Sequence, residues 1–147
     1  CNSYGINDNY DLKSSHFLPA LIRKIIEALK NNRDHIKIWG SGKPLRELIY
    51  CDDVADACIF FLKKKTNVSL INIGTGFEKS INEYANYIMR HLGVKLKILH
   101  EKKNLDGTFR KLLDSSLANR YGWKPQTTLD MGLSNAINDY LQKQLIK

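Results

Sequence analysis

A few cationic and aromatic side chains beside glycine-containing turns have the clearest capacity for chemistry in this sequence. Trp39 precedes the turn at 40–44 and Arg46 follows it, while Arg110 and Lys111 follow a second turn at 106–108. A guanidinium presents a planar fork of donors that fits two phosphate oxygens, and an indole ring has a flat face for stacking on a base or sugar. Together these residues predict contacts with an anionic ligand.

Each of these residues also has a purely structural interpretation. Trp39 ends an apolar strand pattern, so by itself it favours a place in the core. Arg46 by itself favours an ion pair with a surface carboxylate. The imidazole of His16 exchanges a proton near neutral pH, yet a lone histidine most often has a structural role.

The motifs that bind a dinucleotide and transfer a hydride are missing from these 147 residues. A dinucleotide turn needs a third glycine at a fixed offset, and neither Gly40–Gly42 nor Gly74–Gly76 has one. A ketone reductase of the short-chain type needs a Tyr followed four residues later by a Lys, and no Tyr here has one. We therefore expect the isolated chain to be inactive as a reductase.

Composition narrows the class of protein. The net charge is +8 and the pI about 9.4, but the basic residues are scattered apart from small clusters at 63–65 and 102–103, which we interpret as solvated faces. No nucleic-acid motif accompanies the charge, no apolar run approaches the ~20 residues that span a bilayer, and no cysteine spacing is typical of zinc. We expect no nucleic-acid partner, no membrane contact and no metal site. The three cysteines predict reduced thiols in a cytoplasmic protein, with Cys58 buried.

Hydrophobic periodicity predicts the elements that position these side chains. The expected helices are one with Pro19 in its first turn, one capped by Asp52 or Asp53, one opened by the capping box of Ser80 and Glu83 and closed by Gly93, a helical turn at 117–121, and a last helix from near Thr128. The expected strands lie at 36–39, 47–50, 69–73 and 95–99. The pattern indicates one mixed α/β domain with short strands and helices.

Several blocks of the sequence, in this order and spacing, resemble the GDP-L-fucose synthases, which are extended short-chain dehydrogenases. The more specific blocks are Ser-His-Phe-Leu-Pro-Ala-Leu at 15–21 and Asp-Gly-Thr-Phe-Arg-Lys at 106–111. The blocks Trp-Gly-Ser-Gly at 39–42 and Asn-Ile-Gly-Thr-Gly at 72–76 are shared by many extended short-chain dehydrogenases. The resemblance covers essentially the whole chain. It implies a C-terminal substrate-binding domain over 1–147, with 1–10 as the tail of a dinucleotide-binding domain that is otherwise missing.

That family epimerises C3 and C5 of GDP-4-keto-6-deoxy-mannose and then reduces C4 with NADPH. The resemblance implies that His16 is the acid/base residue and also lies by the nicotinamide. It implies that Cys1, Asn2 and Ser3 line the cofactor, which the missing N-terminal part mainly binds. The substrate residues that it implies are Lys24, Trp39, Arg46, Asp106, Arg110 and Lys111.

The sequence departs from the family pattern at a few positions. Lys24 stands where the family usually has Arg, which keeps the charge but loses the bidentate geometry. Phe109 replaces a usual Pro, and Cys1 a usual Thr. A GDP-sugar substrate and a homodimer are expected for the intact enzyme. A reductase of another GDP sugar, such as a deoxyheptose, and a non-catalytic nucleotide-sugar-binding module stay open as alternatives.

Overall fold

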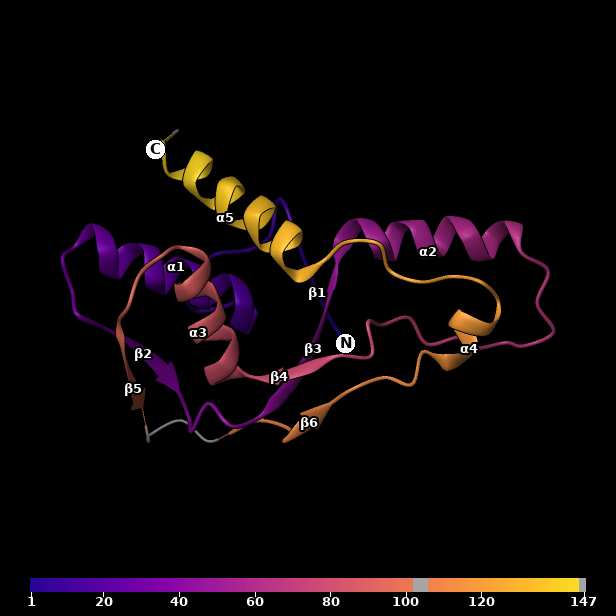
Figure 1. Ribbon diagram of the computed structural model, residues 1–147, viewed down its shortest axis with the longest axis horizontal. Helices are drawn as coiled ribbons and strands as arrows, with labels where there is room; N and C mark the ends of the chain where they lie inside the picture. The colour runs from indigo at the N-terminus through magenta and orange to yellow at the C-terminus, as the bar shows by residue number, and fades with distance from the viewer. Residues whose placement is uncertain (102–105, 146–147) are drawn as a thin grey trace.

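The architecture comes from a computed structural model, which describes residues 1–101 and 106–145. Five helices and six short strands make up this part of the chain (Figure 1). They are β1 (Asn2–Tyr4), α1 (Phe17–Lys30), β2 (His35–Trp39), β3 (Leu45–Tyr50), α2 (Cys51–Lys63), β4 (Glu78–Ser80), α3 (Ile81–His91), β5 (Lys97–Glu101), β6 (Arg110–Lys111), α4 (Ser116–Arg120) and α5 (Leu129–Leu145). The predicted mixed α/β class with short elements is confirmed.

Strand β3 is the centre of the main sheet. Its C-terminal half pairs in parallel with β1, from Asn2 opposite Leu48 to Tyr4 opposite Tyr50. Its N-terminal half pairs with antiparallel β4 and parallel β6. A separate two-stranded parallel sheet joins β2 to β5. Because β3 runs between the two groups of helices in Figure 1, residues near its start lie where several segments meet.

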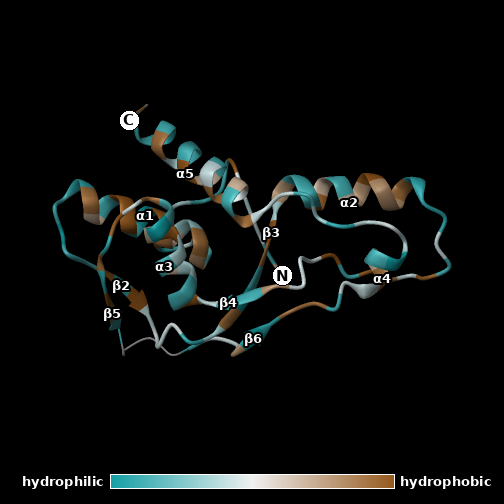
Figure 2. Cartoon of the chain, viewed as in Figure 1, coloured by the Kyte–Doolittle hydropathy of each residue, from teal (hydrophilic) through white to brown (hydrophobic). Residues whose placement is uncertain are grey.

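Two apolar cores lie on either side of β3. The larger packs buried residues of α1, α3 and α5 against β2, and includes Ile25, Ile88 and Leu133. The smaller lies between α2 and α4, around Ala57 and Trp123. Brown and teal residues alternate along α1 and α2 in Figure 2, as expected for helices that bury one face.

The predicted helix starts are confirmed for α1 and α3. Pro19 lies in the first turn of α1, where no helical hydrogen bond needs its nitrogen. At α3 the backbone N–H of Glu83 donates to Ser80 Oγ at 3.2 Å, and the backbone N–H of Ser80 donates to the Glu83 carboxylate at 2.7 Å. This reciprocal pair is the capping box that the sequence predicts.

The predicted start of α2 is wrong. Tyr50, not Asp52 or Asp53, occupies the N-cap position, and it makes no side-chain cap. The carboxylate of Asp53 is buried and instead accepts hydrogen bonds from the backbone N–H groups of Gln126 and Thr127 at 2.9 and 3.1 Å. The Asp53 carboxylate, which the local sequence predicts as a helix cap, therefore accepts hydrogen bonds from a loop that is distant in sequence.

The outer face of α2 also departs from the prediction. Cys58 is exposed, not buried, and Leu62 on the same helix is 86% exposed. The predicted strand at 69–73 is irregular backbone, and β4 forms later, at 78–80. Both differences have the same physical reason: an apolar face or run forms a buried element only where another segment covers or pairs with it.

The other boundaries differ by small shifts that strand pairing explains. β3 begins at Leu45, two residues before the predicted start, because β4 and β6 both pair there. β5 begins at Lys97 because that residue pairs with His35 at the start of β2.

Lysines 63–65 are exposed as predicted, while the cluster at 102–103 lies outside the described residues. The three cysteines are free thiols. Among the described helices, none combines the length and apolar character needed to cross a bilayer.

Candidate functional site

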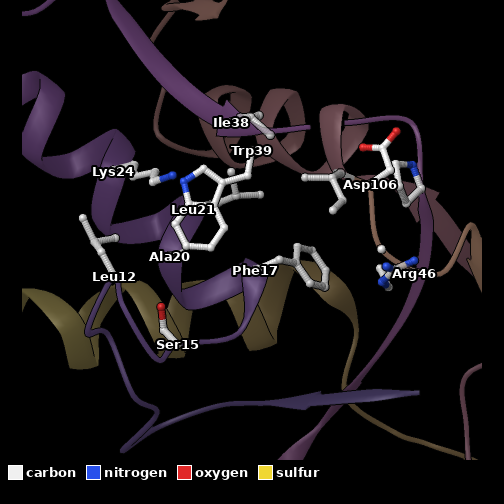
Figure 3. Close-up of a pocket in the computed structure, with 13 residues that line it drawn as sticks. Leu12, Ser15, Phe17, Ala20, Leu21, Lys24, Ile38, Trp39, Arg46 and Asp106 are labelled. Atoms are coloured by element: carbon white, nitrogen blue, oxygen red, sulfur yellow. The ribbon is translucent and has the colours of Figure 1, made fainter. Parts of the chain in front are cut away.

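A pocket opens where the start of α1, the end of β2 and the start of β3 converge (Figure 3). Four of the six residues that the resemblance implies for the substrate lie in its lining: Lys24, Trp39, Arg46 and Asp106. They come from α1, β2, β3 and the segment after β5, so only the tertiary fold brings them together.

Arg46 supplies the guanidinium of the pocket. Its Nη1 donates to the carbonyl oxygens of Leu45 and Thr108, both at 2.7 Å. Among the described residues Arg46 forms no ion pair, so the alternative of a surface carboxylate partner is wrong for this part of the chain. A guanidinium held by carbonyl oxygens keeps its full charge, and its other nitrogens can contact an anion.

Trp39 and Lys24 form the opposite wall. The Trp39 side chain is 56% exposed in the pocket, so its placement in the core is wrong. Lys24 Nζ lies 5.3 Å from the centre of the indole ring and donates to the Lys37 carbonyl oxygen at 2.9 Å. Burial lowers the pKa of Lys24, and the nearby carboxylate of Glu101 opposes that shift. The result is a cation beside an open aromatic face, as Figure 3 shows.

Asp106 stabilises the glycine-containing turn at 40–42 by hydrogen bonds to Ser41. Its two carboxylate oxygens accept from the backbone N–H and the hydroxyl of Ser41, at 2.8 and 2.6 Å. These hydrogen bonds hold the pKa of Asp106 below its usual value. Gly42 has φ +68° and Asn82 lies where a Cβ would be, so the turn requires glycine there.

The structure does not bring Arg110 and Lys111 into the lining of this pocket. The Arg110 guanidinium pairs with the Glu78 carboxylate: Nε donates to Oε1 at 2.8 Å and to Oε2 at 3.0 Å, and Nη2 lies 2.7 Å from Oε1. Glu78 raises the pKa of Arg110. Lys111 is exposed and pairs in β6 with Arg46 of β3, so both cations lie next to the pocket but outside it.

His16 itself is absent from the pocket lining. It occupies the N-cap position of α1, is exposed, and forms no side-chain cap. Its neighbours Ser15 and Phe17 both line the pocket. A side-chain cap is therefore not the structural role of His16, and the residue is exposed between two neighbours that line the pocket.

Cys1, Asn2 and Ser3 lie in and before β1 and are absent from the pocket lining. Cys1 packs against the smaller core, and Ser3 is exposed. The side-chain oxygen Oδ1 of Asn2 is buried without a hydrogen-bond partner among the described residues. A buried acceptor of this kind fits a donor from a bound group or from another segment.

Sequence reasoning missed the residues that shape the pocket between its charged groups. Ser15 and Phe17 form the side of the pocket below Trp39 in Figure 3, and Ser15 Oγ is buried without a partner among the described residues. Their position on either side of His16, a predicted site residue, was the sequence signal that could have identified them. Within residues 1–101 and 106–145, no cluster of three His, Cys, Asp or Glu side chains is placed to hold a metal ion.

Known proteins are similar in sequence to this chain over nearly its whole length. It is 42% identical over 146 residues to a putative GDP-L-fucose synthase 2 from Arabidopsis thaliana, covering 99% of this chain and 44% of the relative. It is 43% identical to a GDP-L-fucose synthase from Sinorhizobium fredii, covering 95% of this chain and 45% of the relative. The chain thus spans less than half the length of these curated relatives.

A solved structure shares the fold over a similar share of the chain. A GDP-D-glycero-L-gluco-heptose synthase from Campylobacter jejuni, solved in the presence of NADPH, is 28% identical with a TM-score of 0.78, covering 96% of this chain and 51% of that chain. The family model described as NAD dependent epimerase/dehydratase matches residues 1–74. That match includes β1, the helix after His16, and the turn between Trp39 and Arg46. This chain therefore belongs to the NAD dependent epimerase/dehydratase family.

Proposed function

We propose that this chain forms the substrate-binding part of an enzyme that makes GDP-L-fucose from GDP-4-keto-6-deoxy-mannose by 3,5-epimerisation and 4-reduction. The observation that carries the proposal is the convergence of Lys24, Trp39 and Arg46 on one pocket. The identity of 42% and 43% to GDP-L-fucose synthases supports the choice of ligand. In this proposal 1–147 is one substrate-binding domain, and 1–10 is the tail of a dinucleotide-binding domain.

The pocket matches the chemical parts of a nucleoside diphosphate sugar. Arg46 and Lys24 provide positive charge for the two phosphates, and the exposed face of Trp39 provides a stacking surface for a ring. Asp106 holds the turn between Trp39 and Arg46, and so preserves their spacing. Arg110 and Lys111 add positive charge next to the pocket rather than inside it.

His16 is the proposed acid/base residue for the epimerisation. A proton on a carbon beside a ketone is acidic enough for an imidazole to remove it, because the charge that develops spreads onto the carbonyl oxygen. The ordinary pKa of His lies near neutral pH, so the ring can both accept and return a proton. The presence of Ser15 and Phe17, its two neighbours in the chain, in the pocket lining supports this assignment.

The proposed cofactor is NADPH, held mainly by a part of the enzyme outside this chain. The buried, unpartnered Oδ1 of Asn2 fits a hydrogen-bond donor from such a group, with Cys1 and Ser3 beside it. NADPH when bound supplies the hydride for reduction of C4. We further propose that the natural protein is a cytoplasmic homodimer.

A second candidate is a reductase of another GDP sugar that does not epimerise its substrate. The 28% identity to a GDP-heptose synthase favours another GDP sugar as the substrate. Incubation of the natural full-length protein with GDP-4-keto-6-deoxy-mannose and NADPH in deuterated water separates the two. The main proposal expects GDP-L-fucose with deuterium at C3 and C5. Reduction without deuterium at these carbons supports the reductase that does not epimerise. If the protein neither binds nor converts a GDP sugar, both candidate functions are contradicted.

A further inference from the structure

The main sheet contains a fully buried carboxylate outside the pocket lining. Glu47 in β3 is 0% exposed. Its Oε1 accepts from the backbone N–H of Gly76 at 2.7 Å, and its Oε2 accepts from the backbone N–H of Leu113 at 2.9 Å. The Thr75 hydroxyl makes a longer contact of 3.5 Å to Oε1. Among the described residues no cation pairs with Glu47, so backbone donors from two loops replace its water.

One of these loops belongs to the segment 106–113, which also contacts the pocket. Leu113 N–H bonds to Glu47 at one end of the segment, and Thr108 accepts from Arg46 Nη1 nearer the other end. Between them, the Leu45 N–H donates to the Phe109 carbonyl oxygen at 2.7 Å. The side chains of Arg46 and Glu47 leave β3 on opposite faces because they are consecutive in a strand. Two adjacent residues of one strand thus hold the same segment at two points.

We propose that Glu47 is a positioning residue for anion binding, acting through segment 106–113 on the guanidinium of Arg46. Without the buried anchor at Leu113, the segment is held mainly by the two-residue pairing of β6 and by exposed contacts such as Asp106 to Ser41. The Thr108 carbonyl then no longer fixes Nη1, and Arg46 must be ordered when the ligand binds. The proposal rests on the proposed function in taking a nucleoside diphosphate as the ligand.

Gly74 provides a second way to disturb the same carboxylate. A Cβ added at Gly74 would collide with Glu47 Oε1 and lie 2.9 Å from its carboxyl carbon. An alanine there must therefore push the carboxylate away from the Gly76 and Leu113 N–H groups. The same Cβ would also lie 2.9 Å from Ser115 Oγ. Neither Gly74 nor Ser115 lines the pocket, so Gly74→Ala can affect the ligand only indirectly.

Asp53 offers a matched control. It too is a buried carboxylate that accepts from two backbone N–H groups, those of Gln126 and Thr127, but it lies on α2, and its hydrogen bonds do not reach segment 106–113. Asp53→Asn and Glu47→Gln both convert a buried carboxylate that accepts from backbone N–H groups into a neutral amide of the same shape. The two variants separate a specific effect on the pocket from a general loss of stability.

The test measures GDP binding by titration calorimetry, and melting temperature, in the natural full-length protein. We expect Glu47→Gln and Gly74→Ala to raise the Kd for GDP by about 3- to 30-fold, the range for mutations that act through a neighbour. Asp53→Asn should lower the melting temperature without changing that Kd. In an Arg46→Ala background, Glu47→Gln should have little further effect, because its effect passes through Arg46.

Unchanged GDP binding in both Glu47→Gln and Gly74→Ala overturns the proposal, as does an equal loss of binding in Asp53→Asn. Full additivity of Glu47→Gln with Arg46→Ala also overturns it. If the unsubstituted protein does not bind GDP, the proposed function itself fails. That result is distinct from failure of the Glu47 proposal, in which the unsubstituted protein binds GDP normally.

Discussion

Arg46 and Thr108 lie 62 residues apart in the chain and meet beside the pocket, where Arg46 Nη1 donates a hydrogen bond of 2.7 Å to the Thr108 carbonyl oxygen. The contact joins β3 to the segment after β5 and turns the guanidinium toward the pocket that also contains Trp39 and Lys24. A guanidinium oriented before the ligand arrives loses less conformational freedom on binding.

Replacement of this guanidinium tests its role directly. We expect Arg46→Ala in the natural full-length protein to weaken binding of the GDP sugar by about 2–4 kcal/mol, the scale for removing one partner of a buried charged contact. Arg46→Lys should restore only part, because an ammonium lacks the planar fork. Arg120, exposed on α4, provides a control whose Ala variant should bind normally. An unchanged KM for the sugar nucleotide in Arg46→Ala would contradict this role.

The open face of Trp39 leads to a second prediction. Trp39→Ala should weaken GDP binding by about 1–3 kcal/mol, the value for stacking of one base on an aromatic ring, with little change in melting temperature. Trp123 is the matched control, because it is buried and its Nε1 donates to Asp56 at 2.9 Å. Trp123→Phe should lower the melting temperature and leave binding intact. Calorimetry and thermal denaturation of both variants check the contrast, and equal effects of the two changes on binding would refute it.

The pH dependence of binding follows from the environment of Lys24. Burial lowers the pKa of Lys24 in the free protein, and a bound diphosphate would raise it again by favouring the charged form. Affinity is therefore fully present below the lowered pKa and is lost as pH rises through it. The measurement is the Kd for GDP from neutral to alkaline pH. Lys24→Arg, which stays charged, should remove this alkaline loss; a loss of the same size in Lys24→Arg would exclude Lys24 as its source.

The role of His16 is tested by isotope exchange rather than by turnover. His16→Asn should lower solvent deuterium incorporation at C3 and C5 of the sugar by about 10²–10⁴-fold, the range for one acid–base group, while reduction of an already epimerised ketone suffers much less. His91→Asn is the control, since His91 contacts Ser134 and Asp130 away from the pocket. Exchange that survives His16→Asn intact would show that another group moves the proton.

Local patterns in the sequence determined α1, α3 and α5, and the first turns of α1 and α3. The spacing of apolar residues predicts α1, α3 and α5, and the Ser80–Glu83 pair marks the first turn of α3, because these signals depend on residues three or four apart. The family resemblance also implied six substrate residues, of which four line one pocket: Lys24, Trp39, Arg46 and Asp106.

Only the tertiary structure decided which of these side chains face the pocket and which are used elsewhere. Arg46 and Arg110 follow similar turns, yet one guanidinium lines the pocket and the other is paired with Glu78. The predictions for Asp53, Cys58 and the run at 69–73 are wrong because the environment of these residues is set by segments far away in sequence, or by the lack of a covering segment. Local periodicity reports that a face is apolar or that a group is charged, whereas burial and pairing depend on contacts between residues distant in the chain.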